Sequence, residues 1–277
     1  MNQALFFIGQ VFLNLLQNMI DVFELANQCL SESEPDRKVD LSLAAAEKIN
    51  SNQLLISKSV KRELIVGWPN KPILVSPQKL PKRKLSTTEG RAAMIHSFAH
   101  IEFNAINLAW DIVCRFRDMP EEFYKDWARV AGEEAKHFSL LNNRLKDMGS
   151  YYGEFDAHDG LWRIANDTAN DVLTRLAVIP RIFEARGLDV TPDIINRFRE
   201  IKDKETASIL EVIYKDEIGH VNIGSNWFRF VCEQRGLNAD ETFMSLFMQF
   251  APSGKNKINR EARLKAGFTL RELESIS

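Results

Sequence analysis

The segments Glu134-Ala-Lys-His137 and Glu217-Ile-Gly-His220 share a Glu-x-x-His pattern, and each follows a lone glutamate at nearly the same distance. The lone glutamates, Glu102 and Glu184, precede the paired glutamates by 32 and 33 residues. On a helix, positions i and i+3 share one face, so each pair can bind one metal ion or bridge two. If the four segments are four helices, four carboxylates and two imidazoles converge on one point.

Four ionised carboxylates cannot share a buried space without compensation, because burial of an unpaired charge costs too much free energy. Two divalent cations bring the sum of these charges to zero. Carboxylate and imidazole ligands favour iron or manganese over metals that prefer thiolate, although ligand type leaves zinc open. We therefore predict two divalent metal ions, iron first, with manganese or a mixed manganese and iron pair as the alternative. The predicted ligands are Glu102, Glu134, His137, Glu184, Glu217 and His220, and no further catalytic residue is predicted.

The helical neighbours of the candidate ligands are apolar. They are Phe98, Ala105, Ile106 and Ala109 around Glu102, Trp127, Val130, Phe138 and Leu141 around Glu134, and Leu210, Ile213, Val221 and Gly224 around Glu217. The alternative, two surface helices with Glu–His ion pairs, would show polar neighbours instead. The small residues Ala105, Ala109 and Gly224 either leave room for dioxygen or a substrate, or allow close helix packing.

Apolar periodicity, capping residues and prolines predict helices over most of the chain. The expected ranges are about 3–30, 40–50, 86–117, 120–148, 160–186, 191–201, 204–235, 240–251 and 269–276. We expect a capping box at Ser86–Glu89, a kink at Pro180, a helix end at Gly187 and a new helix start at Thr191-Pro192. Four prolines make the segment 65–84 an extended strap on the surface. No set of alternating strands is found, so the chain is predicted to be all-α.

The ranges 89–148 and 160–235 each contain one lone Glu and one Glu-x-x-His, which indicates an internal duplication of a metal-binding helix pair. We expect residues 1–85, the N-terminal helices and the Pro-rich strap, to pack on a bundle formed by residues 86–277. The C-terminal helical tail belongs to this second part. The two parts are expected to form one structural unit.

The composition limits the partners and the compartment. A formal net charge of -2 and a pI near 6.3 give no general attraction to nucleic acid or to an anionic membrane. Cys29, Cys114 and Cys232 are far apart and form no C-x-x-C motif, so neither a disulfide framework nor a cysteine-bound zinc is supported. A cytoplasmic protein is expected.

The first twenty residues carry no charged side chain. Their apolar residues recur at helical spacing, which favours an amphipathic helix that docks on the body or on another subunit of a homo-oligomer. An export signal is disfavoured because no Lys or Arg precedes Arg37. The segment is also too short and too polar to span a bilayer.

Several polar residues near the candidate ligands receive other roles. His100 is turned about 200° from Glu102 around a helix axis, so a structural role is favoured over binding at the same cluster. His158 either lines an entrance or caps a helix, and the cap is favoured. Glu133 and Asp216 directly precede the paired glutamates and point off the metal face, as partners of the ligands or as surface groups.

Four segments carry a resemblance to known families: His100–Ala109, His158–Trp162, Pro180–Pro192 and Asp216–Val221. With the six ligand positions, the chain resembles the ferritin-like di-iron carboxylate superfamily, in which two helices give one Glu each and two give Glu-x-x-His. More narrowly, it is similar to the bacterial domain-of-unknown-function 455 family from about residue 20 to the end. The resemblance implies a ferritin-like four-helix bundle with extra terminal helices, and leaves open whether Glu184 is a bridging or a terminal ligand.

The leading functional hypothesis is a dioxygen-activating oxidase or hydroxylase that acts on an organic small molecule and receives electrons from a donor. Tyr214, one turn before Glu217, either takes part in electron transfer or simply packs. A metal-binding or peroxide-scavenging protein without an organic substrate is the alternative. The basic run 79–84 keeps an enzyme like the ferritin-like tRNA hydroxylase open, and a purely structural metal bundle is a further alternative.

Overall fold

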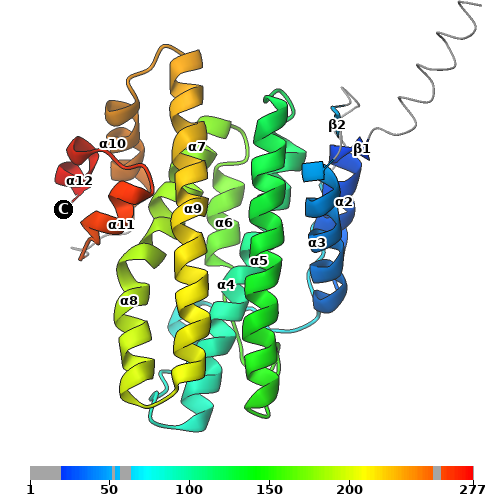
Figure 1. Ribbon diagram of the computed structural model, residues 1–277, viewed down its shortest axis with the longest axis vertical. Coiled ribbons are helices and arrows are strands. Elements are labelled where there is room, and N and C mark those ends of the chain that lie inside the picture. Colours follow the sequence, from blue (N-terminus) through cyan, green and yellow to red (C-terminus); the bar gives the residue numbers. More distant parts are fainter. Residues whose placement is uncertain (1–19, 52–53, 57–63, 252–256, 277) are drawn as a thin grey trace, which may run out of the picture. The chain divides into compact units, whose positions relative to one another are not determined.

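The computed structural model describes residues 20–51, 54–56, 64–251 and 257–276 (Figure 1). These residues are mostly helical, which confirms the all-α prediction. The only strands among them are β1 (Ile20–Asp21) and β2 (Leu54–Leu55), which pair in parallel. Of the helix predicted over about residues 3–30, the part before Ile20 lies outside the described residues, and the rest is β1 followed by α2, Val22–Ser31.

The helices have the following bounds: α2 Val22–Ser31, α3 Pro35–Ser51, α4 Thr88–Arg115, α5 Glu121–Asp147, α6 Gly160–Asp167, α7 Val172–Leu176, α8 Ala185–Glu200, α9 Lys204–Gln234, α10 Ala239–Phe250, α11 Arg260–Lys265 and α12 Leu270–Ile276. A π-helical segment, η2, covers Ala177–Glu184, and a short 3-10 helix, η1, covers Pro77–Lys79. In the described residues, no helix is both long enough and apolar enough to cross a membrane.

The chain divides into two compact units. The first takes its residues from Met1–Pro69 and Ala105–Lys136, and the second from Asn70–Asn104 and His137–Ser277. Helices α4 and α5 therefore contribute residues to both units. The predicted arrangement of residues 1–85 on a bundle stays a prediction.

A buried lysine holds the first unit together. The Lys38 ammonium group, on α3, donates to the Cys29 and Leu30 carbonyls at 2.9 Å each and to Asn107 Oδ1 at 2.6 Å. The two carbonyls belong to the last turn of α2, where the helix has no donors of its own. Burial lowers the pKa of Lys38 to about 7. The side chain thus joins α2, α3 and α4 at one point.

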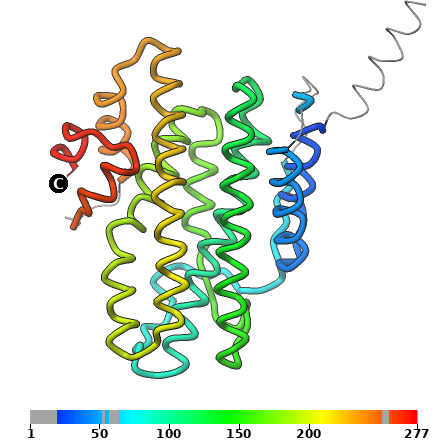
Figure 2. Tube along the Cα trace, in the orientation of Figure 1, coloured from blue at the N-terminus to red at the C-terminus, as the bar shows by residue number. Residues whose placement is uncertain are grey.

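Helix α9 is central in the second unit, where α7, η2, α8, α10 and α11 all contact it. Helices α8 and α9 lie side by side, and the chain reverses between them in a short turn (Figure 2). Asp203 caps α9 by accepting from the Thr206 amide at 3.1 Å. Arg144, near the end of α5, donates to Asp203 and to the Thr206 hydroxyl at 3.0 Å each. These contacts set the register between α5 and α9, the two helices that carry the Glu-x-x-His pairs.

The predicted break between residues 187 and 191 is wrong, because α8 runs unbroken through Gly187 and Pro192. Pro192 has no amide hydrogen, so the carbonyl four residues earlier, that of Leu188, loses its helical donor. Asn259 supplies a replacement: its Nδ2 donates to the Leu188 oxygen at 3.2 Å. A tertiary contact thus compensates for the proline and keeps the helix continuous.

The cap of α4 also differs from the prediction. Thr87, rather than Ser86, accepts from the Gly90 amide at 3.0 Å, and Glu89 pairs with Arg83 at 3.0 Å instead of closing a capping box. Helix α11 was not expected. The sequence signal for this helix is the capping residue Asn259, whose side chain accepts from the Ala262 amide at 3.2 Å.

The strap is extended, as predicted, apart from η1. It is held to the loop after α5, where the Val75 amide donates to the Ala157 carbonyl at 2.8 Å and the Ala157 amide donates to the Ile73 carbonyl at 3.0 Å. Lys79, Lys82 and Lys84 in the basic run are exposed.

Candidate metal centre

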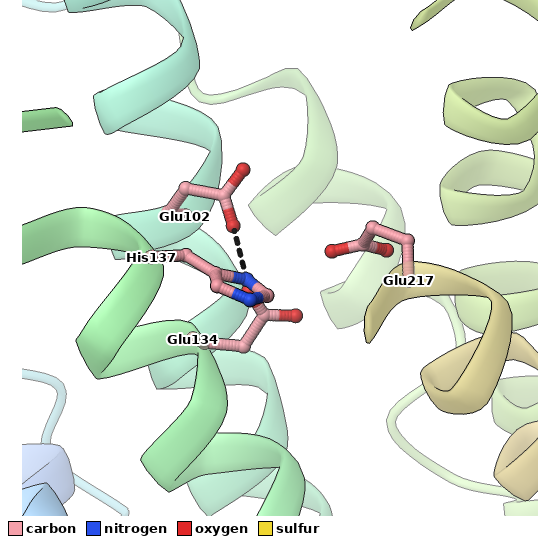
Figure 3. Close-up of side chains that lie close together, drawn as sticks. All are labelled: Glu102, Glu134, His137 and Glu217. Carbon is pink, nitrogen blue, oxygen red and sulfur yellow. Dashed lines mark ion pairs between the residues drawn. The ribbon is translucent and has the colours of Figure 1, made fainter. Parts of the chain in front are cut away.

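Four of the six predicted ligands come together in the structure. Glu102 from α4, Glu134 and His137 from α5, and Glu217 from α9 each offer one ligand atom, and these atoms all lie within 4.8 Å of one another. Figure 3 shows the three carboxylates and the imidazole turned toward a common point. Glu134 joins the cluster from the turn of α5 that precedes His137. Glu102, Glu134 and His137 are buried, whereas Glu217 is partly exposed.

The orientation of the His137 ring is fixed from outside the cluster. Its Nε2 lies 3.1 Å from Asp216 Oδ2, and its Nδ1 lies 3.4 Å from Glu102 Oε2 (Figure 3). An ionised carboxylate only accepts hydrogen bonds, so the contact with Asp216 assigns the proton to Nε2. The Nδ1 of the ring then faces the Glu102 carboxylate, a contact that a proton or a cation between the two atoms makes favourable.

His220 borders this cluster without belonging to it. Its Nδ1 lies 3.5 Å from Glu217 Oε1, and its ring centroid is 5.6 Å from that of His137. The side chain is buried, at 1% exposure. His220 is therefore placed to extend the cluster by one nitrogen ligand on the side of α9.

Glu184 is not part of the four-residue group. The prediction that it lies in the last turn before a helix end is wrong, because η2 continues directly into α8 at Ala185. The side chain is partly exposed. Its role as a metal ligand stays a prediction.

The π-helical segment η2 lies where the kink at Pro180 was predicted, and it ends at Glu184. Pro180 lies inside η2 and lacks the amide that an α-helix would use. Gly224 on α9 packs against it so closely that a Cβ atom at Gly224 would lie 2.4 Å from Pro180 Cβ. Of the two interpretations of Gly224, the structure thus supports close packing. Single π-helical turns are frequent at functional sites.

The geometry of the four side chains fits a metal ion. Two ligand atoms bound to one ion at about 2.1 Å each lie no more than about 4.2 Å apart. Ligand atoms within 4.8 Å of one another therefore need to move by only a few tenths of an ångström to reach one ion. Glu102 and Glu134 are 5% and 1% exposed, so water cannot compensate their charge well. The oxygen and nitrogen donors suit iron, manganese or zinc.

The other histidines on α4 have contacts away from the cluster. His100 Nδ1 lies 2.9 Å from the Tyr152 hydroxyl, and His96 Nε2 accepts from the Gly153 amide at 2.9 Å. Burial lowers the pKa of each imidazole to about 4, so both are neutral near pH 7. These contacts tie α4 to the loop after α5, in agreement with the structural role expected for His100.

Two further predicted alternatives can be compared with the structure. His158 Nδ1 accepts from the Gly160 amide at 3.2 Å, at the start of α6, as expected for a cap. The Tyr214 hydroxyl accepts from Asn259 Nδ2 at 3.0 Å, which is a packing contact with the segment before α11.

The contact between Asp216 and His137 is more specific than the sequence analysis predicted. The signal was the acidic residue directly before the paired glutamate, which occurs in both copies as Glu133 and Asp216. The pattern could not show that Asp216 contacts the histidine of the other copy, because this depends on how α5 and α9 face each other.

Comparisons with known proteins agree with the narrower resemblance. A family model described as "Protein of unknown function (DUF455)" matches residues 31–274. A protein of Haemophilus influenzae (strain ATCC 51907 / DSM 11121 / KW20 / Rd), described as "Uncharacterized protein", is 47% identical over 225 residues, which cover 78% of this chain and 78% of that protein. No solved structure gives a significant match. Because the family model spans most of the sequence, the chain belongs to the DUF455 family.

Proposed function

We propose that this chain is a ferritin-like dinuclear metal protein and that it catalyses the oxygen-dependent oxidation of an organic molecule. The proposed ligands are Glu102, Glu134, His137, Glu184, Glu217 and His220. One observation carries the proposal: Glu102, Glu134, His137 and Glu217 each offer one ligand atom, these atoms lie within 4.8 Å of one another, and three of the four residues are buried. Three carboxylates that share such a space with an imidazole nitrogen form a site that a cation would stabilise.

The charge of the cluster supports two ions rather than one. Glu102, Glu134 and Glu217 carry three negative charges, and one divalent ion would leave one of them uncompensated. With Glu184 as a fourth carboxylate, two divalent ions give neutrality. His220 lies beside Glu217 and would give the second ion a nitrogen ligand equivalent to the one that His137 gives the first.

When bound, a pair of ferrous ions would supply electrons for the reduction of dioxygen. In a hydroxylation, one oxygen atom enters a C–H bond of the substrate and the other leaves as water, with two electrons and two protons from an external donor. The chain provides the ligands, fixes their orientation and excludes water. Phe103 and Phe138, which directly follow Glu102 and His137 in the sequence, are both fully buried with ring centroids 5.6 Å apart, and this apolar packing would limit the access of water.

Iron storage is less well supported than catalysis. A storage protein needs a hollow shell of many compact subunits, whereas the second unit here carries a long strap and the tail helices α10, α11 and α12. Peroxide scavenging uses the same metal ligands, so the two activities are distinguished by the oxidant that the protein consumes.

The test is an anaerobic titration of the full chain with ferrous iron, followed by oxygen uptake. We expect two ions per chain in the wild type and fewer than one in Glu134→Ala. Glu122→Gln, an exposed change on the same helix, is the control and should bind as the wild type does. Absence of metal binding would refute the metal site. If the protein binds metal and consumes peroxide but takes up no oxygen, peroxide scavenging replaces substrate oxidation as the proposed function.

A further inference from the structure

A buried ion pair links the π-helical segment to the C-terminal helix. Arg181 Nη2, in η2, donates to both carboxylate oxygens of Glu272, in α12, at 2.7 Å each. The two side chains are 0% and 1% exposed. Both residues belong to the second unit. A pair this deeply buried is costly to desolvate and persists only when both partners are held in place.

The surroundings of Arg181 hold its guanidinium group firmly. Its central carbon lies over the rings of Phe228, Phe243 and Phe268, at 4.7, 4.1 and 4.7 Å from their centroids. Its Nε donates to the Ser225 hydroxyl on α9 at 3.2 Å. No other carboxylate pairs with Arg181 in the ion pairs found among the described residues. Glu272 is therefore the countercharge of this arginine.

Glu272 is held equally well from its own side. Its Oε2 accepts from the Thr269 amide at 2.8 Å, and the Thr269 hydroxyl accepts from the Glu272 amide at 3.1 Å. This reciprocal pair is a capping box at the start of α12. The Glu272 carboxylate thus caps the start of α12 and also neutralises Arg181. Helix α12 therefore cannot pack in this position without a contact to η2.

We infer that Arg181 and Glu272 are positioning residues that hold η2 in its π-helical form and thereby set the place of Glu184. The inference rests on the proposed function, because it concerns the second metal ion. Glu184 is three residues after Arg181 and ends η2. A π-helix has more residues per turn than an α-helix, so relaxation of η2 to an α-helix would turn Glu184 around the helix axis.

Local sequence alone does not hold this geometry. Pro180 removes one amide, and Gly224 gives the proline ring space, but π-helical turns are rare and weakly favoured. The ion pair supplies the missing tertiary restraint from a helix 91 residues away in the sequence.

The chain offers a matched control. Arg263 on α11 pairs with Asp189 on α8, with Nη2 to Oδ2 at 2.6 Å and Nε to Oδ1 at 3.0 Å. Both side chains are buried, and the pair also docks the tail. Asp189 lies in regular α-helix after Glu184, so its loss weakens tail docking without releasing η2.

The experiment is equilibrium dialysis of the full chain against Mn²⁺ for the wild type, Glu272→Gln and Asp189→Asn. We expect two ions in the wild type and in Asp189→Asn. In Glu272→Gln, the affinity for the second ion should fall by about tenfold or more, as for the loss of other residues that orient ligands. Wild-type affinity for both ions in a folded Glu272→Gln variant would overturn the inference.

Hydrogen exchange of the wild type gives an answer even if Glu272→Gln does not fold. Binding of Mn²⁺ should slow amide exchange in η2 and in α12 together, and less in α11. Unchanged exchange in α12 on binding of the second ion would overturn the inference. A wild type that binds no metal refutes the proposed function itself, whereas two ions in both wild type and Glu272→Gln refute only the role of the pair.

Discussion

Among residues outside the proposed ligands, Asp216 gives the sharpest test of the proposed metal centre through removal of its carboxylate. Asp216 Oδ2 lies 3.1 Å from His137 Nε2 and accepts the proton on that nitrogen, which turns Nδ1 toward Glu102 and the proposed metal site. In Asp216→Ala, either nitrogen can carry the proton and the ring can rotate. We expect weaker metal binding, because part of the population then has the wrong tautomer or orientation.

The expected loss of metal affinity depends on how far the Asp216 side chain is exposed to water. Loss of residues that orient metal ligands typically costs about 10- to 100-fold in affinity. The Asp216 side chain is 28% exposed, so water replaces part of the lost interaction, which favours the lower limit. We expect a decrease of about tenfold in the affinity for one ion, or about 1.4 kcal/mol.

The assay is a competition titration of Mn²⁺ or Fe²⁺ against a chelator of known affinity. Glu211→Ala is the control, because it removes an exposed carboxylate of the same helix that pairs with Arg199 on the surface. Asp216→Asn adds a second comparison, since its amide can donate to Nε2 and so stabilise the tautomer that cannot bind metal through Nδ1. Wild-type affinity in both Asp216 variants would refute the assigned orientation of His137.

Three further predictions concern stability, each measured by urea unfolding of the full chain. Burial lowers the pKa of His96 from 6.5 in the unfolded chain to about 4 in the folded protein. The neutral ring therefore contributes fully to the free energy of unfolding above pH 6.5, and this contribution is lost as the pH falls toward 4. In His96→Gln, the loss of stability over this pH range should be smaller by up to a few kcal/mol. An unchanged slope would contradict this. Lys38→Met removes the donor to the Cys29 carbonyl and Asn107 Oδ1, whereas the Leu30 carbonyl keeps the Gly67 amide at 2.8 Å. It should cost about 2 kcal/mol or more, and a loss below about 1 kcal/mol would show that these acceptors are satisfied otherwise. Gly224→Ala should cost about 1–3 kcal/mol through the clash with Pro180, whereas Gly187→Ala, with no atom within 4 Å of the new Cβ, should stabilise by up to about 1 kcal/mol.

The helices could be predicted from sequence where the signals are local. The bounds of α5 and α9 follow from prolines, glycines and apolar periodicity, and the structure reproduces them within about two residues. The juxtaposition of Glu102, Glu134, His137 and Glu217 was also predictable, because the repeated spacing indicated two equivalent helix pairs.

The prediction failed where tertiary contacts override local preference. Thr191-Pro192 has the local form of a helix start, but Asn259, about 70 residues later, supplies the donor that Pro192 lacks. Likewise, η2 contacts Gly224 on α9 through Pro180 and Glu272 on α12 through Arg181. Such contacts join residues that no periodic pattern relates, so a single sequence does not reveal them.

Two ion pairs outside the proposed ligands, Arg144–Asp203 and Arg181–Glu272, can align the helices of the site before a metal binds. Carboxylates within 4.8 Å of one another repel, so without cations the cluster destabilises the packing of α4, α5 and α9. Arg144 fixes the start of α9 to the end of α5, and Arg181 fixes η2 to the tail. Each uses charges outside the ligand set, so the alignment does not depend on the ions. Binding of an ion at 100 times its dissociation constant then adds about 2.7 kcal/mol to stability. On the proposed role of the Arg181–Glu272 pair, metal-dependent stabilisation should therefore persist in Asp189→Asn and decrease in Glu272→Gln, because only the latter loses a contact that positions Glu184.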